Sequence, residues 1–174
     1  MNEENWRRWI RKNVQAANPL LWILDNSLAC APRPLRYHPA FGGRVALIAP
    51  EAAPVLREWL AALRAHGIGT IVALATPGEL KRYSAVVSPE PDLLSLYRSF
   101  GFLVHHHPID DPAHVPASAR VGILQQIEAL KPVVFAEYQK RVGGLLISCS
   151  GGMDRSAPVA ASVANKVAGR CPFV

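Results

Sequence analysis

The sequence has few cysteines and no cysteine pair of a recognisable kind. Its 174 residues contain three cysteines, Cys30, Cys149 and Cys171, which are scattered and odd in number. They are too few for a disulfide framework, and no Cys-x-x-Cys pair indicates a zinc site. We therefore expect a protein of a reducing compartment.

Targeting and membrane-spanning signals are also missing. The N-terminal residues MNEENWRRWIRKN carry neither the apolar stretch nor the small-residue cleavage site of a signal peptide. No apolar run approaches the roughly 20 residues that a membrane-spanning helix needs. We expect a cytoplasmic protein without stable membrane insertion.

Charged residues are sparse, at 18% of the chain, and the formal net charge is +6. A basic balance favours anionic partners in general. The cations are dispersed, however, and form no Arg/Lys stripe interleaved with aromatic residues, which a nucleic-acid groove would need. We therefore expect no nucleic-acid partner, and the charge alone selects phosphate-bearing ligands only weakly.

Strand and helix patterns alternate along the chain. Apolar residues at helical spacing predict helices over 5–16, 54–66, 91–100, 117–141 and 156–167, with Pro132 as a candidate break. Short apolar runs bounded by turn residues predict strands over 20–24, 68–74, 102–107 and 144–148. This alternation predicts a three-layer α/β/α fold whose mostly parallel central sheet has about four to five strands. We expect one domain over 1–174, with 1–19 as an N-terminal helical extension.

The N-terminal helix has two interpretations. Trp6, Trp9 and Ile10 recur at helical spacing with four cations between them, as in a basic helix that lies on a membrane or a partner. The same pattern fits a terminal helix whose tryptophans pack on the domain. We favour packing, because one short helix with four cations binds bilayers only marginally.

The most informative stretch is ISCSGGMDRSA, at 147–157. It lies between a predicted strand and the last helix, where sheets of this type bind ligands. Five residues separate Cys149 from Arg155, so their backbone amides can turn inward around an anion near the positive end of the helix. These phosphate-loop residues are Ser150, Gly151, Gly152, Met153 and Asp154. Because a guanidinium can bind two phosphate oxygens, the stretch predicts a phosphate-binding loop closed by Arg155.

The same donors favour the thiolate form of Cys149, which makes it a candidate nucleophile for phosphoryl transfer through a phosphocysteine. Ser156 could donate a hydrogen bond to the sulfur when it departs. An acid must protonate the leaving oxygen, and the loop HHPIDDPAHVP supplies Asp110 and Asp111. This chemistry requires no metal and no organic cofactor.

Each of these residues also has a structural interpretation. Cys149 could be a buried apolar side chain, and adjacent loop aspartates commonly belong to turns. His105 and His107 share one face of a predicted strand without other evident metal ligands, so we expect structural hydrogen bonds there. Cys30 could be a redox partner of Cys149, but a buried structural cysteine is the simpler interpretation.

The stretch resembles the signature H-C-x-x-G-x-x-R-[ST] of cysteine-dependent dual-specificity and protein tyrosine phosphatases, with Cys149, Gly152, Arg155 and Ser156 at matching positions. Upstream, GIGTIVAL, GELKRY and DLLSLYRSFGFLVHHHPIDD are similar to the succession in kinase-associated phosphatases, which act on cyclin-dependent kinases. The resemblance implies a dual-specificity-phosphatase-like fold. It also implies Cys149 as nucleophile, Arg155 as phosphate clamp, and Asp111, in preference to Asp110, as general acid.

Two residues depart from this pattern. Ser148 stands where the family has histidine before the nucleophile, which implies a less ordered loop and slower turnover. Asp154 is similar to the W-D-R or L-D-R ending in myotubularin-like and Sac-type phosphoinositide phosphatases, and it is an alternative acid.

We expect a phosphatase that acts on a phosphorylated protein. The alternative suggested by Asp154 is a phosphoinositide or inositol-phosphate phosphatase, whose substrate is a phosphorylated lipid or small molecule. A second alternative is an inactive phosphate-binding module, suggested by Ser148 and by the short segment after Arg155.

Overall fold

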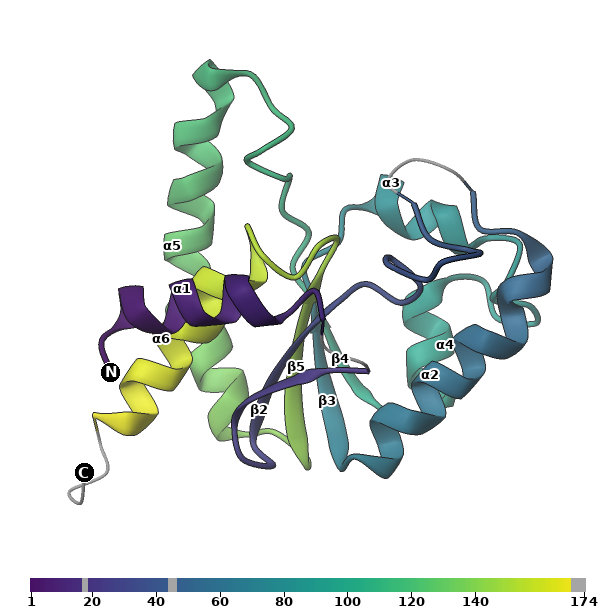
Figure 1. The fold of residues 1–174 in the computed structure, drawn as a ribbon, viewed down its shortest axis with the longest axis horizontal. Helices are drawn as coiled ribbons and strands as arrows, with labels where there is room; N and C mark the ends of the chain where they lie inside the picture. Colours follow the sequence, from purple (N-terminus) through teal and green to yellow (C-terminus); the bar gives the residue numbers. More distant parts are fainter. Residues whose placement is uncertain (17–18, 44–46, 170–174) are drawn as a thin grey trace.

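A five-stranded sheet runs through the centre of the molecule, with helices on both faces (Figure 1). The computed structural model describes residues 1–16, 19–43 and 47–169. The strands are β1 (Leu21–Leu24), β2 (Leu28–Pro32), β3 (Ile68–Ala73), β4 (Leu103–His106) and β5 (Gly144–Cys149). Their spatial order is β1-β2-β5-β3-β4, and only the β1/β2 pair is antiparallel within the described residues. The predicted three-layer fold with a mostly parallel sheet is therefore confirmed.

The helices form the two outer layers. They are α1 (Glu3–Asn13), α2 (Ala53–Ala65), α3 (Pro77–Leu80), α4 (Leu93–Ser99), α5 (Ala117–Gln139) and α6 (Ser156–Ala168), with short 3-10 turns η1 (Pro50–Ala52) and η2 (Lys81–Tyr83). In Figure 1, α1, α5 and α6 lie on one face of the sheet, and α2, α3 and α4 lie on the other. The five predicted helices are confirmed to within a few residues, whereas α3 was not predicted.

The predicted break at Pro132 is wrong, because α5 continues through it for 23 residues. A proline removes one backbone donor, so the carbonyl one turn earlier, at Glu128, loses its partner. Pro132 and Glu128 both lie on the exposed side of the helix, where water can hydrogen bond to that carbonyl. The helix therefore tolerates the proline.

Strand β2 was missed by the sequence interpretation. Its residues Leu-Ala-Cys-Ala-Pro lack the β-branched side chains on which strand prediction depends. It lies between β1 and β5 with Leu28 to Ala31 fully buried, and burial on both faces explains why it shows no polar alternation. Asn26, at φ 53°, makes the turn from β1. The pairing of β2 with β5 sets Pro32 opposite Cys149 and brings the next loop to the candidate site.

The N-terminal helix packs on the domain, as favoured from the sequence. Helix α1 lies across α6, and Ile10 and Val14 are fully buried in the core between the helices and the sheet (Figure 1). Trp6 packs against the same core. The ring of Trp9 lies edge-on to the ring of Trp6, with 6.1 Å between the ring centroids. Over the described part of the chain, none of the helices has the length and apolarity required to cross a membrane.

Candidate active site

The predicted site residues meet at the carboxyl end of β5. Cys149 is the last residue of β5, and Ser156 is the first of α6. A cavity of about 610 Å³ opens here. Its walls include Cys149, Ser150, Gly151, Met153 and Asp154 from the loop and Asp110 and Asp111 from the segment after β4. Gly152, Arg155 and Ser156 are buried behind these walls.

Glycine is required at position 152 by the conformation of the loop. Gly152 has φ +75°, which L side chains rarely adopt. A Cβ there would lie 2.9 Å from Val14 Cγ2 and 3.1 Å from the backbone nitrogen of Pro32. The signature glycine therefore lets the loop turn tightly against α1 and the end of β2.

Arg155 is completely buried and is held on one edge by Glu79. Its Nη1 donates to Glu79 Oε2 at 2.7 Å, and its Nη2 donates to Glu79 Oε1 at 2.8 Å. Nη1 also donates to the carbonyls of Leu74 and Ile109. Among the described residues, Arg155 Nε has no hydrogen-bond partner, although it is buried. The guanidinium is thus fixed in orientation while its Nε donor stays unused.

The charges of Arg155 and Glu79 support each other. Burial by itself would lower the pKa of Arg155, but its hydrogen bonds to Glu79 and its electrostatic attraction to Cys149, Glu79 and Asp111 raise it. Burial by itself would raise the pKa of Glu79, but the hydrogen bonds donated by Arg155 and the positive charge of Arg155 outweigh burial and lower it to about 2. Both groups are therefore ionised at neutral pH.

Glu79 was quoted within GELKRY but given no role in the sequence interpretation. It is part of a capping box at the start of α3, where Thr76 Oγ1 accepts from Glu79 N at 3.2 Å and Glu79 Oε2 accepts from Thr76 N at 2.8 Å. A Thr-x-x-Glu spacing is visible in the sequence, but it indicates only a helix start. The contact with Arg155, 76 residues away, leaves no local signal.

Tyr83, at the end of the same motif, supports the loop after β2. Its hydroxyl accepts from Arg33 Nη1 at 2.9 Å and donates to the carbonyl of Pro34 at 2.6 Å. The backbone nitrogen of Arg33 donates in turn to the carbonyl of Cys149 at 2.7 Å. Tyr83 and Arg33 therefore tie the GELKRY segment to the residue that carries the candidate nucleophile.

The three candidate acids all line the cavity, but they have different partners. Asp111 Oδ1 accepts from Ala113 N at 3.0 Å, and Asp111 Oδ2 lies 3.2 Å from His114 Nδ1 and 3.6 Å from Arg155 Nη2. Asp154 pairs with Arg11 of α1, whereas Asp110 is exposed. Asp111 is thus the acid whose carboxylate faces the buried arginine.

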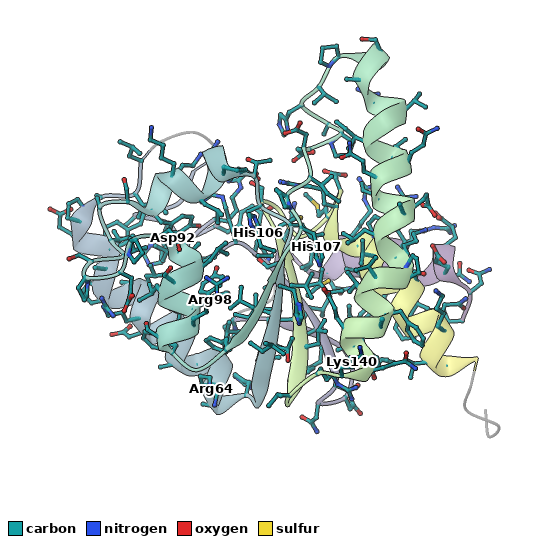
Figure 2. All side chains as sticks on the ribbon, turned by 180° about the vertical axis from the view of Figure 1, so that it is seen from behind. Arg64, Asp92, Arg98, His106, His107 and Lys140 are labelled. Atoms are coloured by element: carbon teal, nitrogen blue, oxygen red, sulfur yellow. The ribbon has the colours of Figure 1, made fainter. Side chains whose placement is uncertain are left out.

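The three consecutive histidines have structural partners, and His106 and His107 make the expected hydrogen bonds. His105 Nδ1 and His107 Nε2 lie 3.2 and 2.8 Å from Glu137 Oε1 on α5, and His106 Nε2 lies 2.8 Å from the carbonyl of Ala75. Figure 2 shows His106 and His107 at the end of β4, where the chain leaves the sheet. Within the described residues, no group of three or more His, Cys, Asp or Glu side chains is arranged to hold a metal ion.

Cys30 is a buried residue of β2. Burial raises the pKa of its thiol well above the ordinary value, and the electrostatic interaction with Cys149 adds to this effect. A thiol that stays protonated reacts slowly, which favours the structural interpretation over a redox role. Cys171 lies outside the described residues.

The fold and the cysteine loop define a dual-specificity-phosphatase-like protein. A family model described as cyclin-dependent kinase inhibitor 3 matches residues 54–169, so the chain belongs to the cyclin-dependent kinase inhibitor 3 family. The human and pig proteins named cyclin-dependent kinase inhibitor 3 are 34% and 32% identical to it over 99 residues. Each match covers 57% of this chain and 41% of the relative. The chain thus spans about two fifths of the length of these relatives.

The fold is also similar to that of a solved structure. The crystal structure of kinase-associated phosphatase with its catalytic-site cysteine replaced by serine has a TM-score of 0.53 and 24% sequence identity. The similarity covers 80% of this chain and 65% of that chain. Together with the family match, it confirms the resemblance to kinase-associated phosphatases and the dual-specificity-phosphatase-like fold.

Proposed function

We propose that this protein is a cysteine-dependent phosphatase that hydrolyses a phosphomonoester of a phosphorylated protein through a phosphocysteine intermediate. The observation that carries the proposal is Arg155, buried and fixed by Glu79 behind the loop of Cys149, with its Nε donor unused. In this proposal residues 1–174 act as one phosphatase domain, and residues 1–19 are its N-terminal helical extension.

The first step is attack of the Cys149 thiolate on phosphorus. An S–P bond forms as the P–O bond to the leaving group breaks, and Asp111 gives its proton to the departing oxygen. The amides of residues 150–154, the amino end of α6 and Arg155 stabilise the phosphoryl oxygens. Asp111 is left as a carboxylate facing the guanidinium.

The second step is hydrolysis of the phosphocysteine. Water attacks phosphorus, Asp111 accepts a proton from it, and the S–P bond breaks to restore the Cys149 thiolate. Ser156 Oγ is buried and has no hydrogen-bond partner among the described residues. Its hydroxyl is therefore available to donate to the departing sulfur.

Replacement of Asp111 by asparagine is expected to lower kcat by about 10²-fold or more, the contribution typical of a general acid. Phosphate release from an aryl phosphate measures this effect. Asp110→Asn is the matched control, because the neighbouring aspartate is exposed, and it should change the rate only slightly. If Asp154→Asn lowers the rate more than Asp111→Asn does, the assignment of the acid is wrong.

A phosphorylated protein is favoured over a phosphoinositide by the relatives, whose names refer to kinases. The cavity walls carry both signs of charge, because they include Arg36 and Arg82 as well as Asp110, Asp111 and Asp154.

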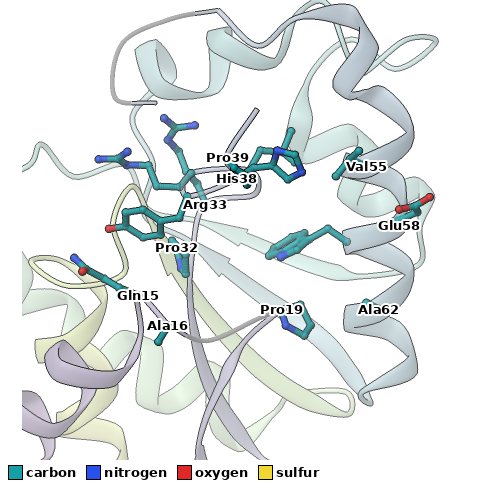
Figure 3. Close-up of a pocket in the computed structure, with 14 residues that line it drawn as sticks. Gln15, Ala16, Pro19, Pro32, Arg33, His38, Pro39, Val55, Glu58 and Ala62 are labelled. Atoms are coloured by element: carbon teal, nitrogen blue, oxygen red, sulfur yellow. The ribbon is translucent and has the colours of Figure 1, made fainter. Parts of the chain in front are cut away.

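A second cavity supports an extended substrate (Figure 3). It measures about 580 Å³ and shares Gln15, Arg36 and Tyr37 with the first cavity. The Tyr37 hydroxyl donates to the carbonyl of Gly151 at 3.4 Å, at the rim of the loop. In Figure 3 this cavity lies between the turn after α1, marked by Gln15, and Glu58 and Ala62 of α2. It offers space for the chain that flanks a phosphorylated residue.

The proposed function is tested with phosphopeptides that carry phosphotyrosine, phosphothreonine or phosphoserine, compared with a panel of phosphoinositides. We expect phosphate release with a higher kcat/KM on at least one peptide. A preference for phosphoinositides would support the alternative substrate class. Binding of phosphopeptides without any phosphate release would support the inactive module and overturn the proposal.

A further inference from the structure

Helix α1 and the turn that follows it contact three consecutive residues of the phosphate-binding loop. Val14 lies where a side chain at residue 152 would have to be placed. Gln15 Nε2 donates to Met153 Sδ at 3.0 Å, and Arg11 Nη2 lies 3.1 Å from Asp154 Oδ1. Helix α1 is about 140 residues away in the sequence, but Figure 1 shows it lying across α6 near the loop. The loop is therefore supported by a helix outside the signature.

The negative charge of the Asp154 side chain is unfavourable in a loop that binds phosphate. It immediately precedes Arg155, it lines the cavity, and its carboxylate carries the same sign of charge as the ligand. The preceding loop residues, Ser150 to Met153, are all uncharged. A carboxylate that is not compensated would repel a phosphate dianion in this partly buried place.

We propose that Arg11 is a positioning residue of the candidate active site, which holds the Asp154 carboxylate toward α1 and cancels its charge so that the loop can bind phosphate. This inference rests on the proposed function, because it assumes that the loop binds phosphate. Arg11 has no direct contact with the ligand in this role. It acts through Asp154, whose side chain is only 26% exposed.

The Arg11 pair differs from the other ion pairs of α1. Arg7 and Arg8 pair with Glu4 inside the helix, at 3.8 and 4.0 Å. Such surface pairs contribute little to stability, and Arg11 itself is 44% exposed. The loss of Arg11 should consequently affect the phosphate affinity of the loop more than the stability of the fold.

The test measures binding of inorganic phosphate by calorimetry in the Cys149→Ser chain, where no covalent step can occur. Arg11→Gln is expected to weaken phosphate binding about five- to tenfold, the order expected for one uncompensated charge near a partly solvated site. Arg8→Gln is the matched control, since it removes the same charge from the same helix, and it should leave the affinity unchanged. Arg11→Lys, which keeps the charge, should restore most of the affinity.

A double variant distinguishes the effect of Arg11 through Asp154 from a direct long-range attraction between the Arg11 charge and phosphate. In the Asp154→Asn background there is no carboxylate to cancel, so adding Arg11→Gln should cost no further affinity. With the active chain, Arg11→Gln should raise KM for an aryl phosphate more than it lowers kcat. Melting temperatures of all variants identify any that fail to fold.

Three outcomes would overturn the inference. In the first, Arg11→Gln and Arg8→Gln bind phosphate with equal affinity. In the second, Arg11→Gln weakens phosphate binding equally in the Asp154 and Asp154→Asn backgrounds, and in the third, Arg11→Gln lowers the melting temperature but leaves the phosphate affinity unchanged. The inference and the proposed function can fail separately. A chain that releases no phosphate but shows the predicted binding pattern supports the inference alone, whereas an active chain indifferent to Arg11→Gln supports the proposed function alone.

Discussion

Replacement of Cys149 by serine is expected to lower the rate of phosphate release from an aryl phosphate by about 10⁴-fold or more. This is the order found when a covalent nucleophile is removed. A serine hydroxyl stays protonated at neutral pH and cannot replace the thiolate. Serine is close to cysteine in size, and the site is 98% buried, so the fold and the phosphate-binding amides should be retained. Calorimetry should therefore still detect phosphopeptide binding.

The other buried cysteine provides the control. Cys30→Ala removes a thiol from the neighbouring strand, where the structure indicates only a packing role. It should lower the melting temperature through the cavity it leaves and change kcat only slightly. If Cys30→Ala abolishes turnover and Cys149→Ser does not, the nucleophile has been assigned to the wrong cysteine.

Replacement of Glu79 by alanine should have the largest effect on stability. It leaves the Arg155 guanidinium without its two charged hydrogen bonds at a site with no solvent access. Breaking a buried pair in this way costs about 3–5 kcal/mol of unfolding free energy. Urea unfolding at pH 7 measures the loss, and Glu51→Ala, which removes an exposed carboxylate, should change it only slightly.

The same substitution should affect catalysis, because Glu79 orients the arginine that would bind the phosphoryl group. A Glu79→Gln variant keeps the shape of the side chain but not its charge, and it should preserve more stability than Glu79→Ala. Both variants should lower kcat/KM on an aryl phosphate under conditions where they remain folded. Normal kcat/KM in a folded Glu79→Ala protein would show that Arg155 does not depend on this carboxylate.

Stability should depend on pH through Glu79. Its pKa is lowered from the ordinary 4.5 to about 2, which corresponds to a contribution of about 3 kcal/mol to the free energy of unfolding at neutral pH. The folded state therefore holds the proton less tightly than the unfolded chain. The stabilisation is fully present above about pH 4.5 and is lost as the pH falls toward 2.

The comparison of the parent protein with Glu79→Gln isolates this contribution from those of the other carboxylates. The difference in unfolding free energy should be constant above about pH 5 and should narrow as the pH falls below 4.5. A difference that stays constant from pH 5 to pH 3 would contradict the lowered pKa of Glu79.

Sequence reasoning located the candidate site because its main signal is local. Cys149, the two glycines, Arg155 and Ser156 fall within eight consecutive positions that run from the end of a strand to the start of a helix. Their order along the chain already implies backbone amides that turn inward around an anion, with an arginine beside them, independently of the rest of the fold. Asp110 and Asp111 are predicted as acids from the loop after a strand, and the resemblance favours Asp111. The structure brings both to the same cavity from the segment after β4.

The order of the strands in the sheet was harder to predict from the sequence. Strands β3, β4 and β5 have the β-branched or aliphatic runs that predict buried strands. Strand β2 consists of one leucine, three small residues and a proline, so its place beside β5 depends on its partners rather than on its own strand propensity. That placement brings Arg33 to the carbonyl of Cys149.

Hydrophobic periodicity and the short spacing of the cysteine loop are properties of neighbouring residues, and they were sufficient to predict the layers of the fold and the position of the loop. The partners of that loop could be identified only after folding. Glu79 reaches Arg155, and Arg11 reaches Asp154, across 76 and 143 residues. Such contacts arise because the sheet order and the packing of α1 on α6 bring distant segments together. No local pattern records them, so only the tertiary structure shows which charges are paired around the candidate nucleophile.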